Sequence, residues 1–108
     1  MIAIIDSGGA NISSVQFALE RLGAQSLLTR DAAEIAAADR VLLPGVGSAP
    51  VAMKALGDAQ LIEPIRQLRQ PVLGICLGMQ LLFGRSFEGD TDLLGILDGA
   101  CQAFTPSE

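Results

Sequence analysis

The sequence predicts an α/β fold: a doubly wound, mostly parallel sheet with helices on both faces, in a flavodoxin-like arrangement. Short apolar runs that suit buried strands alternate with amphipathic or alanine-rich stretches that suit helices. Half of the 108 residues are hydrophobic, as expected when parallel strands are covered on both faces. Strands that alternate with helices need crossover connections, and these connections produce a parallel sheet.

Four strands are expected in the main sheet and two shorter ones near residue 100. The strands cover residues 1–5, 25–29, 41–43 and 72–75, then 95–97 and 100–104 around a turn at residues 98 and 99. The helices lie between residues 11 and 23, 31 and 38, 48 and 57, 61 and 69, and 79 and 83. Residues 88–92 are expected to form a polar loop.

Residue types at the boundaries support these elements. Side chains that favour helix N-caps precede three helices, namely Asn11 or Ser13, Asp31 and Ser48. Gly23 is expected to end the first helix. Pro44 should break the third strand, Gly57 should interrupt the helix after Ser48, and Pro64 should lie in the first turn of the next helix.

Composition and charge argue against several classes of function. Net charge is −5, with 7 basic and 12 acidic residues spread along the chain, so no basic stripe is present for nucleic acid. No apolar run approaches the roughly 18 residues that a membrane-spanning helix needs, and we recognise no secretion signal. Two cysteines without any histidine argue against a zinc site. We therefore expect reduced thiols, a cytoplasmic location and no metal or cofactor.

Three loops are expected to line one crevice beyond the sheet, because ligands of such sheets bind outside the carboxyl ends of the strands. These loops are residues 7–11, 44–47 and 76–78. Asp6 and Asn11 lie at the end of the first strand. Either could contact a ligand or partner, although both are ordinary residues for turns and caps.

Cys76 is the strongest candidate for a reactive residue. The preceding strand passes into a helix through this one residue, with Gly74 two positions before it and Gly78 two positions after. This is the spacing of a nucleophile elbow with cysteine in place of serine. Such a turn strains the backbone at Cys76, exposes its sulfur and directs the N–H of Leu77 toward a developing oxyanion. The alternative is a small apolar cysteine packed at a strand end.

Other residues near the elbow give weaker signals. Gly45 and Gly47 would let a backbone N–H turn toward the same oxyanion, or they would simply form a strand-to-helix turn. Gln80 lies one helical turn beyond Cys76 and could reach the crevice, or it could be a solvated side chain. Cys101 has no glycine turn beside it and is interpreted as a strand residue without a catalytic role.

At these residues the sequence resembles the class I, triad-type glutamine amidotransferases. Gly-Ile-Cys-Leu-Gly-Met-Gln-Leu-Leu at residues 74–82 is similar to the signature of that family. Pro-Gly-Val-Gly at residues 44–47 and the opening Ile-Asp-Ser-Gly-Gly-Ala-Asn resemble one group within it, the glutaminase subunits of imidazole glycerol phosphate synthases. The resemblance runs along the whole chain and implies the amino-terminal part of a single amidotransferase domain, residues 1–108.

The resemblance implies that glutamine is hydrolysed to glutamate and ammonia, with Cys76 as the nucleophile. Leu77 and the Gly45–Val46 backbone would supply oxyanion N–H groups, and Gly47 and Gln80 would help to hold glutamine. The ammonia would pass to a (β/α)₈-barrel cyclase subunit, which forms imidazole glycerol phosphate and an aminoimidazole carboxamide ribonucleotide in histidine biosynthesis. In this heterodimer Asn11 and Pro44 would lie near the interface.

The sequence also departs from that family. Members are about twice as long and take their catalytic histidine and glutamate from a His-Pro-Glu stretch near the C-terminus, whereas this sequence has no histidine. We therefore expect a fragment that is essentially inactive as given. The alternatives are a glutaminase of another synthase, a different small α/β cysteine protein of peptidase or chaperone type, and a non-catalytic interaction module of the same fold.

Overall fold

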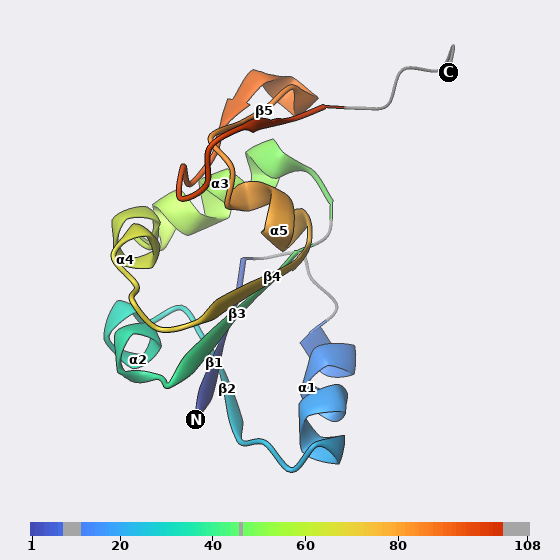
Figure 1. Ribbon diagram of the computed structural model, residues 1–108, viewed down its shortest axis with the longest axis vertical. Helices are drawn as coiled ribbons and strands as arrows, with labels where there is room; N and C mark the ends of the chain where they lie inside the picture. Colours follow the sequence, from blue (N-terminus) through green and yellow to red (C-terminus); the bar gives the residue numbers. More distant parts are fainter. Residues whose placement is uncertain (8–11, 46, 103–108) are drawn as a thin grey trace.

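A computed structural model describes residues 1–7, 12–45 and 47–102, and its main feature is a four-stranded parallel sheet (Figure 1). The strands are β1 (Ile2–Ile5), β2 (Ser26–Thr29), β3 (Arg40–Gly45) and β4 (Val72–Cys76). Their order is β2-β1-β3-β4, and each pair of neighbours is parallel. This order matches the start of the flavodoxin-like arrangement, so the predicted fold class is confirmed.

Helices cover both faces of the sheet, but unequally. Figure 1 shows α1 (Ile12–Arg21) alone on one side, with α2 (Ala32–Ala37) and α4 (Ile62–Arg66) on the other. The remaining helices are α3 (Ala49–Asp58) and α5 (Leu77–Leu81), and both contribute to the core on the side of α2 and α4. α1 has no buried residue.

The core lies between the sheet and helices α2 to α5. Its largest fully buried members are Ile5, Ile35, Leu43, Leu56, Leu61, Ile65, Leu81 and Leu94. Side chains alternate between the two faces of a strand, so Ala3 and Ile5 join this core while Ile4 points toward the side of α1. On β4, Val72 packs against the core, whereas Leu73 is 58% exposed on the side of α1.

Several predicted boundaries are confirmed. Asp31 caps α2 by accepting hydrogen bonds from the N–H groups of Ala33 and Glu34, and Ser48 caps α3 by accepting one from Val51. Pro64 lies in the first turn of α4.

Other boundary predictions are wrong. Ser13 is the second residue of α1 and therefore not its N-cap; the alternative, Asn11, is outside the described residues. Gly57 does not interrupt α3, which continues to Asp58, because a helical glycine costs only about 1 kcal/mol and the burial of Leu56 outweighs it. α4 ends at Arg66 rather than near residue 69, with Gln67 as its C-cap.

Pro44 does not break β3, which continues through Gly45. Proline lacks an N–H and is tolerated where a strand has a free side. β1 pairs with β3 only as far as Leu42, so beyond that point β3 has a ladder partner only in β4. On the side that β1 has left, Ser7 Oγ donates a hydrogen bond to the carbonyl oxygen of Pro44 at 3.2 Å.

A second, three-stranded sheet follows α5. It contains β5 (Arg85–Ser86), β6 (Thr91–Asp92) and β7 (Ala100–Cys101), with a 3₁₀ turn, η1 (Glu88–Asp90), in the segment expected to be a polar loop. The prediction of a strand at residues 95–97 is wrong. The N–H groups of Gly95, Ile96 and Leu97 instead bond to carbonyls of Leu82 and Phe83, in the turn that ends α5.

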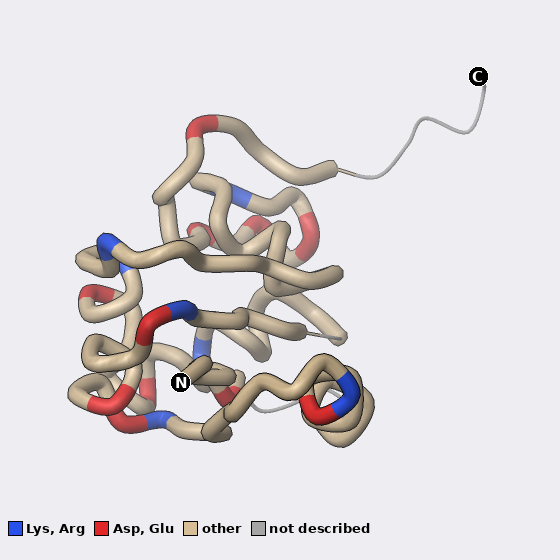
Figure 2. Tube along the Cα trace, turned by 60° about the horizontal axis from the view of Figure 1, so that its bottom comes forward, with Lys and Arg blue, Asp and Glu red and all other residues tan. Residues whose placement is uncertain are grey.

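Charged residues are scattered along the chain trace rather than gathered in one region (Figure 2). The seven Lys and Arg residues come from different elements, and four of them pair with nearby carboxylates. The Met1 ammonium bonds to Asp39 at 2.8 Å and holds the pKa of that carboxyl below its ordinary value. This contact stabilises the fold at neutral pH and is lost as the pH falls through the lowered pKa. Among the described helices, none is long and apolar enough to cross a membrane.

The core predicts how α3 responds to truncation of its side chains. Leu56→Ala should lower the free energy of unfolding by about 2–5 kcal/mol, because it opens a cavity at a fully buried position. Val51→Ala in the same helix should change it by less than about 0.5 kcal/mol, because Val51 is 66% exposed. Urea unfolding followed by circular dichroism measures both, and equal losses would contradict this description of the core.

Candidate active site

The backbone of Cys76 has the conformation of a nucleophile elbow. Cys76 ends β4 and immediately precedes α5, with φ 56° and ψ −123°. A positive φ is unusual for a residue with a side chain, and such strain persists only where the surroundings enforce it. The thiol is free and the residue is exposed, so its sulfur is accessible at the carboxyl end of the sheet.

Close backbone contacts explain both elbow glycines. A Cβ on Gly78 would lie 1.7 Å from the carbonyl oxygen of Leu43 in β3. One on Gly74 would lie 2.6 Å from Cα of Met79 in α5. Neither position has room for a side chain, so α5 can begin directly after Cys76 only because both residues are glycine. The helix therefore starts at Leu77, not near residue 79 as predicted, and buries Leu77 and Leu81.

β3 brings Gly45 to the elbow. Gly45 is paired in register with Cys76, and a Cβ on it would lie 2.9 Å from the backbone nitrogen of Gly78. The backbone of Gly45 is thus packed against the start of α5. Leu77 and Gly78 are the first residues of α5. Their backbone N–H groups have no hydrogen-bond partner within the helix, and they lie next to Cys76, where the strand turns into the helix. The structure brings together Cys76, Leu77, Gly78 and Gly45.

The remaining predicted residues lie farther along the same loops. Gly47 is exposed, with φ 93°, and comes just before the N-cap of α3. Val46 and Asn11 are outside the described residues. Pro44 is buried beside the elbow, and its expected place near an interface stays a prediction. Asp6 is ion-paired with Arg30 at 3.2 Å.

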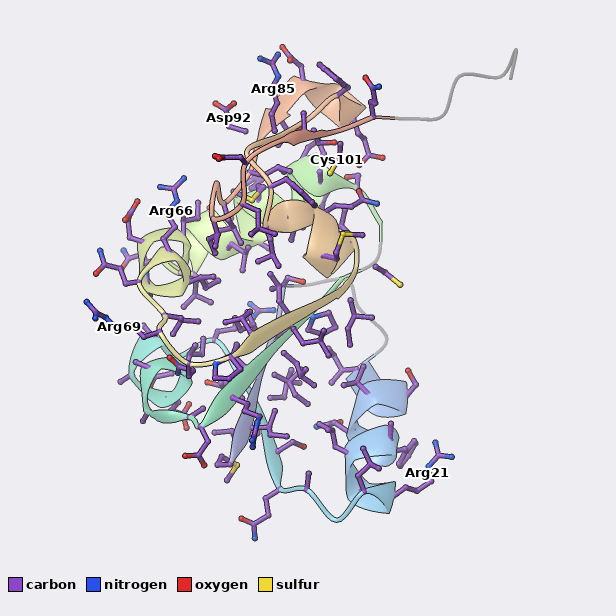
Figure 3. All side chains as sticks on the ribbon, viewed as in Figure 1. Arg21, Arg66, Arg69, Arg85, Asp92 and Cys101 are labelled. Carbon is purple, nitrogen blue, oxygen red and sulfur yellow. The ribbon has the colours of Figure 1, made fainter. Side chains whose placement is uncertain are left out.

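Gln80 is half-buried and faces a cleft between α5 and the second sheet. The cleft is lined by Met79, Gln80, Phe83, Ser86, Phe87, Glu88, Ala100, Cys101 and Gln102. Cys101 (Figure 3) is a strand residue as predicted, although β7 covers only Ala100–Cys101 of the described part of the predicted strand. Its thiol donates to the carbonyl oxygen of Gln80 at 3.8 Å. The second cysteine is therefore half-buried against α5, whereas Cys76 is exposed.

Two contacts near the site have no signal in the sequence. Ser7, two residues beyond the end of β1, donates to the carbonyl oxygen of Pro44, and Glu88 accepts a hydrogen bond from the N–H of Ala49 at 2.8 Å. Serine in a loop and Glu-Gly-Asp in a turn are ordinary residues, and these contacts join positions 37 and 39 residues apart. No group of three or more metal-ligating side chains occurs within residues 1–7, 12–45 and 47–102.

Comparison with known proteins identifies similar chains. Residues 3–95 match the family described as glutamine amidotransferase class-I. The chain is 56% identical over 106 residues to the imidazole glycerol phosphate synthase subunit HisH of Xanthomonas axonopodis pv. citri, and 54% identical over 106 residues to that of Xylella fastidiosa. These matches cover 98% of this chain and 53% of each relative. The subunit of Idiomarina loihiensis is 58% identical over 96 residues, which cover 89% of this chain and 49% of that relative. The chain therefore spans about half the length of the curated relatives it matches.

The elbow geometry predicts a strong effect of adding one methyl group. Gly78→Ala should destabilise the chain by at least about 3 kcal/mol, because the new Cβ would collide with the backbone carbonyl of Leu43. Gly57→Ala should instead stabilise it by about 0.5–1 kcal/mol, since a Cβ there meets only Ile62 Cδ1 at 3.6 Å within a helix. Urea unfolding of both variants distinguishes them, and a tolerated Gly78→Ala would show that β3 and α5 are not this close.

Proposed function

The chain belongs to the class-I glutamine amidotransferase family, and from that premise we propose that it supplies the nucleophilic part of a glutaminase. Cys76 Sγ attacks the side-chain amide carbon of glutamine and forms a tetrahedral intermediate. Collapse of this intermediate expels ammonia and leaves a thioester, which water hydrolyses to glutamate and the free thiol. The observation that carries the proposal is the exposed sulfur of Cys76 at a positive-φ turn directly before a helix.

Backbone groups around the elbow suit stabilisation of the intermediate. We assign the oxyanion to the N–H of Leu77 and to the backbone from Gly45 through Val46, whose described end is packed against α5. Donors of this kind act on charge that develops in the transition state, and losing one costs about 10²–10³-fold in kcat. Gly47 and Gln80 are assigned to hold the rest of the glutamine, with Gln80 one turn beyond the sulfur.

The proposed proton transfer needs a histidine, which is absent from these 108 residues. The sequence has no histidine, and the resemblance implies that a histidine and a glutamate come from a His-Pro-Glu stretch. We propose that residues 1–108 are the amino-terminal part of one amidotransferase domain and that a further polypeptide segment provides this pair. The 108-residue chain alone is then expected to hydrolyse glutamine about 10⁴–10⁶-fold more slowly than a complete enzyme.

The names of the relatives point to a role in histidine biosynthesis. Because those relatives are imidazole glycerol phosphate synthase subunits, we propose that the ammonia is consumed by a cyclase subunit with a (β/α)₈ barrel in a cytoplasmic heterodimer. That subunit would form imidazole glycerol phosphate and an aminoimidazole carboxamide ribonucleotide, which is the lyase part of the reaction. Asn11 and Pro44 are the candidate residues near this interface.

A chimaera tests the proposed function. Residues 1–108 are joined to the part of the Xanthomonas axonopodis relative that this chain does not match, and glutamate release is measured with the cyclase subunit of that organism present. The chimaera should hydrolyse glutamine. Cys76→Ala should lower kcat by about 10⁴-fold or more, because it removes the proposed nucleophile. Cys101→Ala is the matched control and should retain kcat within about threefold.

Each contrary result has a distinct meaning. Equal losses of kcat in Cys76→Ala and Cys101→Ala would refute the assignment of Cys76 as the nucleophile. An inactive chimaera that still binds the cyclase would favour the non-catalytic interaction module. Glutamine hydrolysis that is coupled to a different synthase would favour a glutaminase of another pathway.

A further inference from the structure

The geometry points to Glu88 as a positioning residue that holds the oxyanion segment through the start of α3, an inference that rests on the proposed function. The described residues concerned are Gly45, Gly47, Ser48 and Ala49. At Ala49, the first residue of α3, the backbone N–H donates to Glu88 Oε1 at 2.8 Å. The two residues are 39 positions apart, so this contact ties the second sheet to the loop beside Cys76.

Glu88 is itself firmly held. Its backbone N–H donates to Ser86 Oγ at 3.1 Å, and Ser86 is only 2% exposed. Its carbonyl oxygen accepts a hydrogen bond from Thr91 Oγ1 at 2.9 Å. With the backbone of Glu88 held on both sides, only its side-chain torsions remain to be ordered when the carboxylate meets Ala49.

Packing between η1 and α3 supports the same contact. Gly89 has φ 62°, and a Cβ on it would lie 2.6 Å from Pro50 Cγ. The turn therefore approaches the first turn of α3 as closely as a residue without a side chain allows. Glu88 and Gly89 thus contact Ala49 and Pro50, consecutive residues at the start of the helix. In Figure 1 the orange segment containing β5 lies directly beside α3.

The consequence concerns the connection between β3 and α3, of which Gly47 and Ser48 are described. One end of this segment is fixed at Gly45, which packs against Gly78, and the other end is fixed at Ala49 by Glu88. Ser48 Oγ accepts a hydrogen bond from the N–H of Val51 and so secures the first turn of the helix itself. Among the described residues, Glu88 therefore positions the Gly47 end of the segment relative to Cys76.

Hydrogen exchange in the 108-residue chain tests the contact, and kinetics in the chimaera test its role. Glu88→Ala should raise the exchange rate of the Ala49 amide about tenfold, since a hydrogen bond to a protein acceptor is lost. It should lower kcat for glutamine about tenfold or more, with KM within about twofold, because the oxyanion donors are misplaced. Glu88→Gln should retain most of the exchange protection at Ala49 and most of kcat, because its amide oxygen still accepts a hydrogen bond from the Ala49 N–H.

Two controls separate positioning from other effects. Asp92→Ala removes the same charge at an exposed position of β6 (Figure 3) and should leave exchange and kcat unchanged within about twofold. Alkylation of Cys76 by iodoacetamide should proceed at an unchanged rate in Glu88→Ala, which shows that the elbow is intact.

The outcomes are decisive. A kcat that stays within twofold in Glu88→Ala overturns the inference, as does a raised KM at unchanged kcat, which would mean that Glu88 contacts substrate. Glu88→Gln as deficient as Glu88→Ala also overturns it. If the unsubstituted chimaera is inactive, the proposed function fails, whereas an unchanged exchange rate at Ala49 in Glu88→Ala refutes the positioning contact independently.

Discussion

At Gly78 the backbones of β3 and α5 approach so closely that no side chain fits between them. A Cβ at this position would overlap the carbonyl oxygen of Leu43, and similar crowding occurs at Gly74 and Gly45. These three glycines let β4, its neighbour β3 and helix α5 come into direct backbone contact. Cys76 is the residue left to make the turn, and it does so with a positive φ. The strain at Cys76 is thus enforced by packing that involves 43–45 as well as 74–79.

That constraint links the fold to the proposed chemistry. A parallel sheet brings the ends of β3 and β4 to the same edge, where Gly45 is paired with Cys76. The tight turn leaves the sulfur exposed while it buries Leu77, so a nucleophile and the first N–H groups of α5 lie together. Contacts from Ser7 to Pro44 and from Glu88 to Ala49 hold the neighbouring loop from two other elements.

The sequence predicted most of the sheet and the elbow because their signals are local. Apolar runs predicted all four main strands, and Gly74 with Gly78 predicted the turn at Cys76. The errors lie where distant contacts override local preference. Pro44 stays in β3 because β1 has already ended beside it, and residues 95–97 bond to the end of α5 instead of forming a strand. The contact of Glu88 with Ala49 was not predictable, because a carboxylate in a turn carries no information about a partner 39 residues away.

The conformation of Cys76 is the most direct test of this account, and a crystal structure of the chain measures it. The account predicts a φ near +56° at Cys76, a thiol open to solvent, and the backbones of Leu43 and Gly78 in contact. An extended backbone at Cys76, or a sulfur enclosed by apolar side chains, would contradict it.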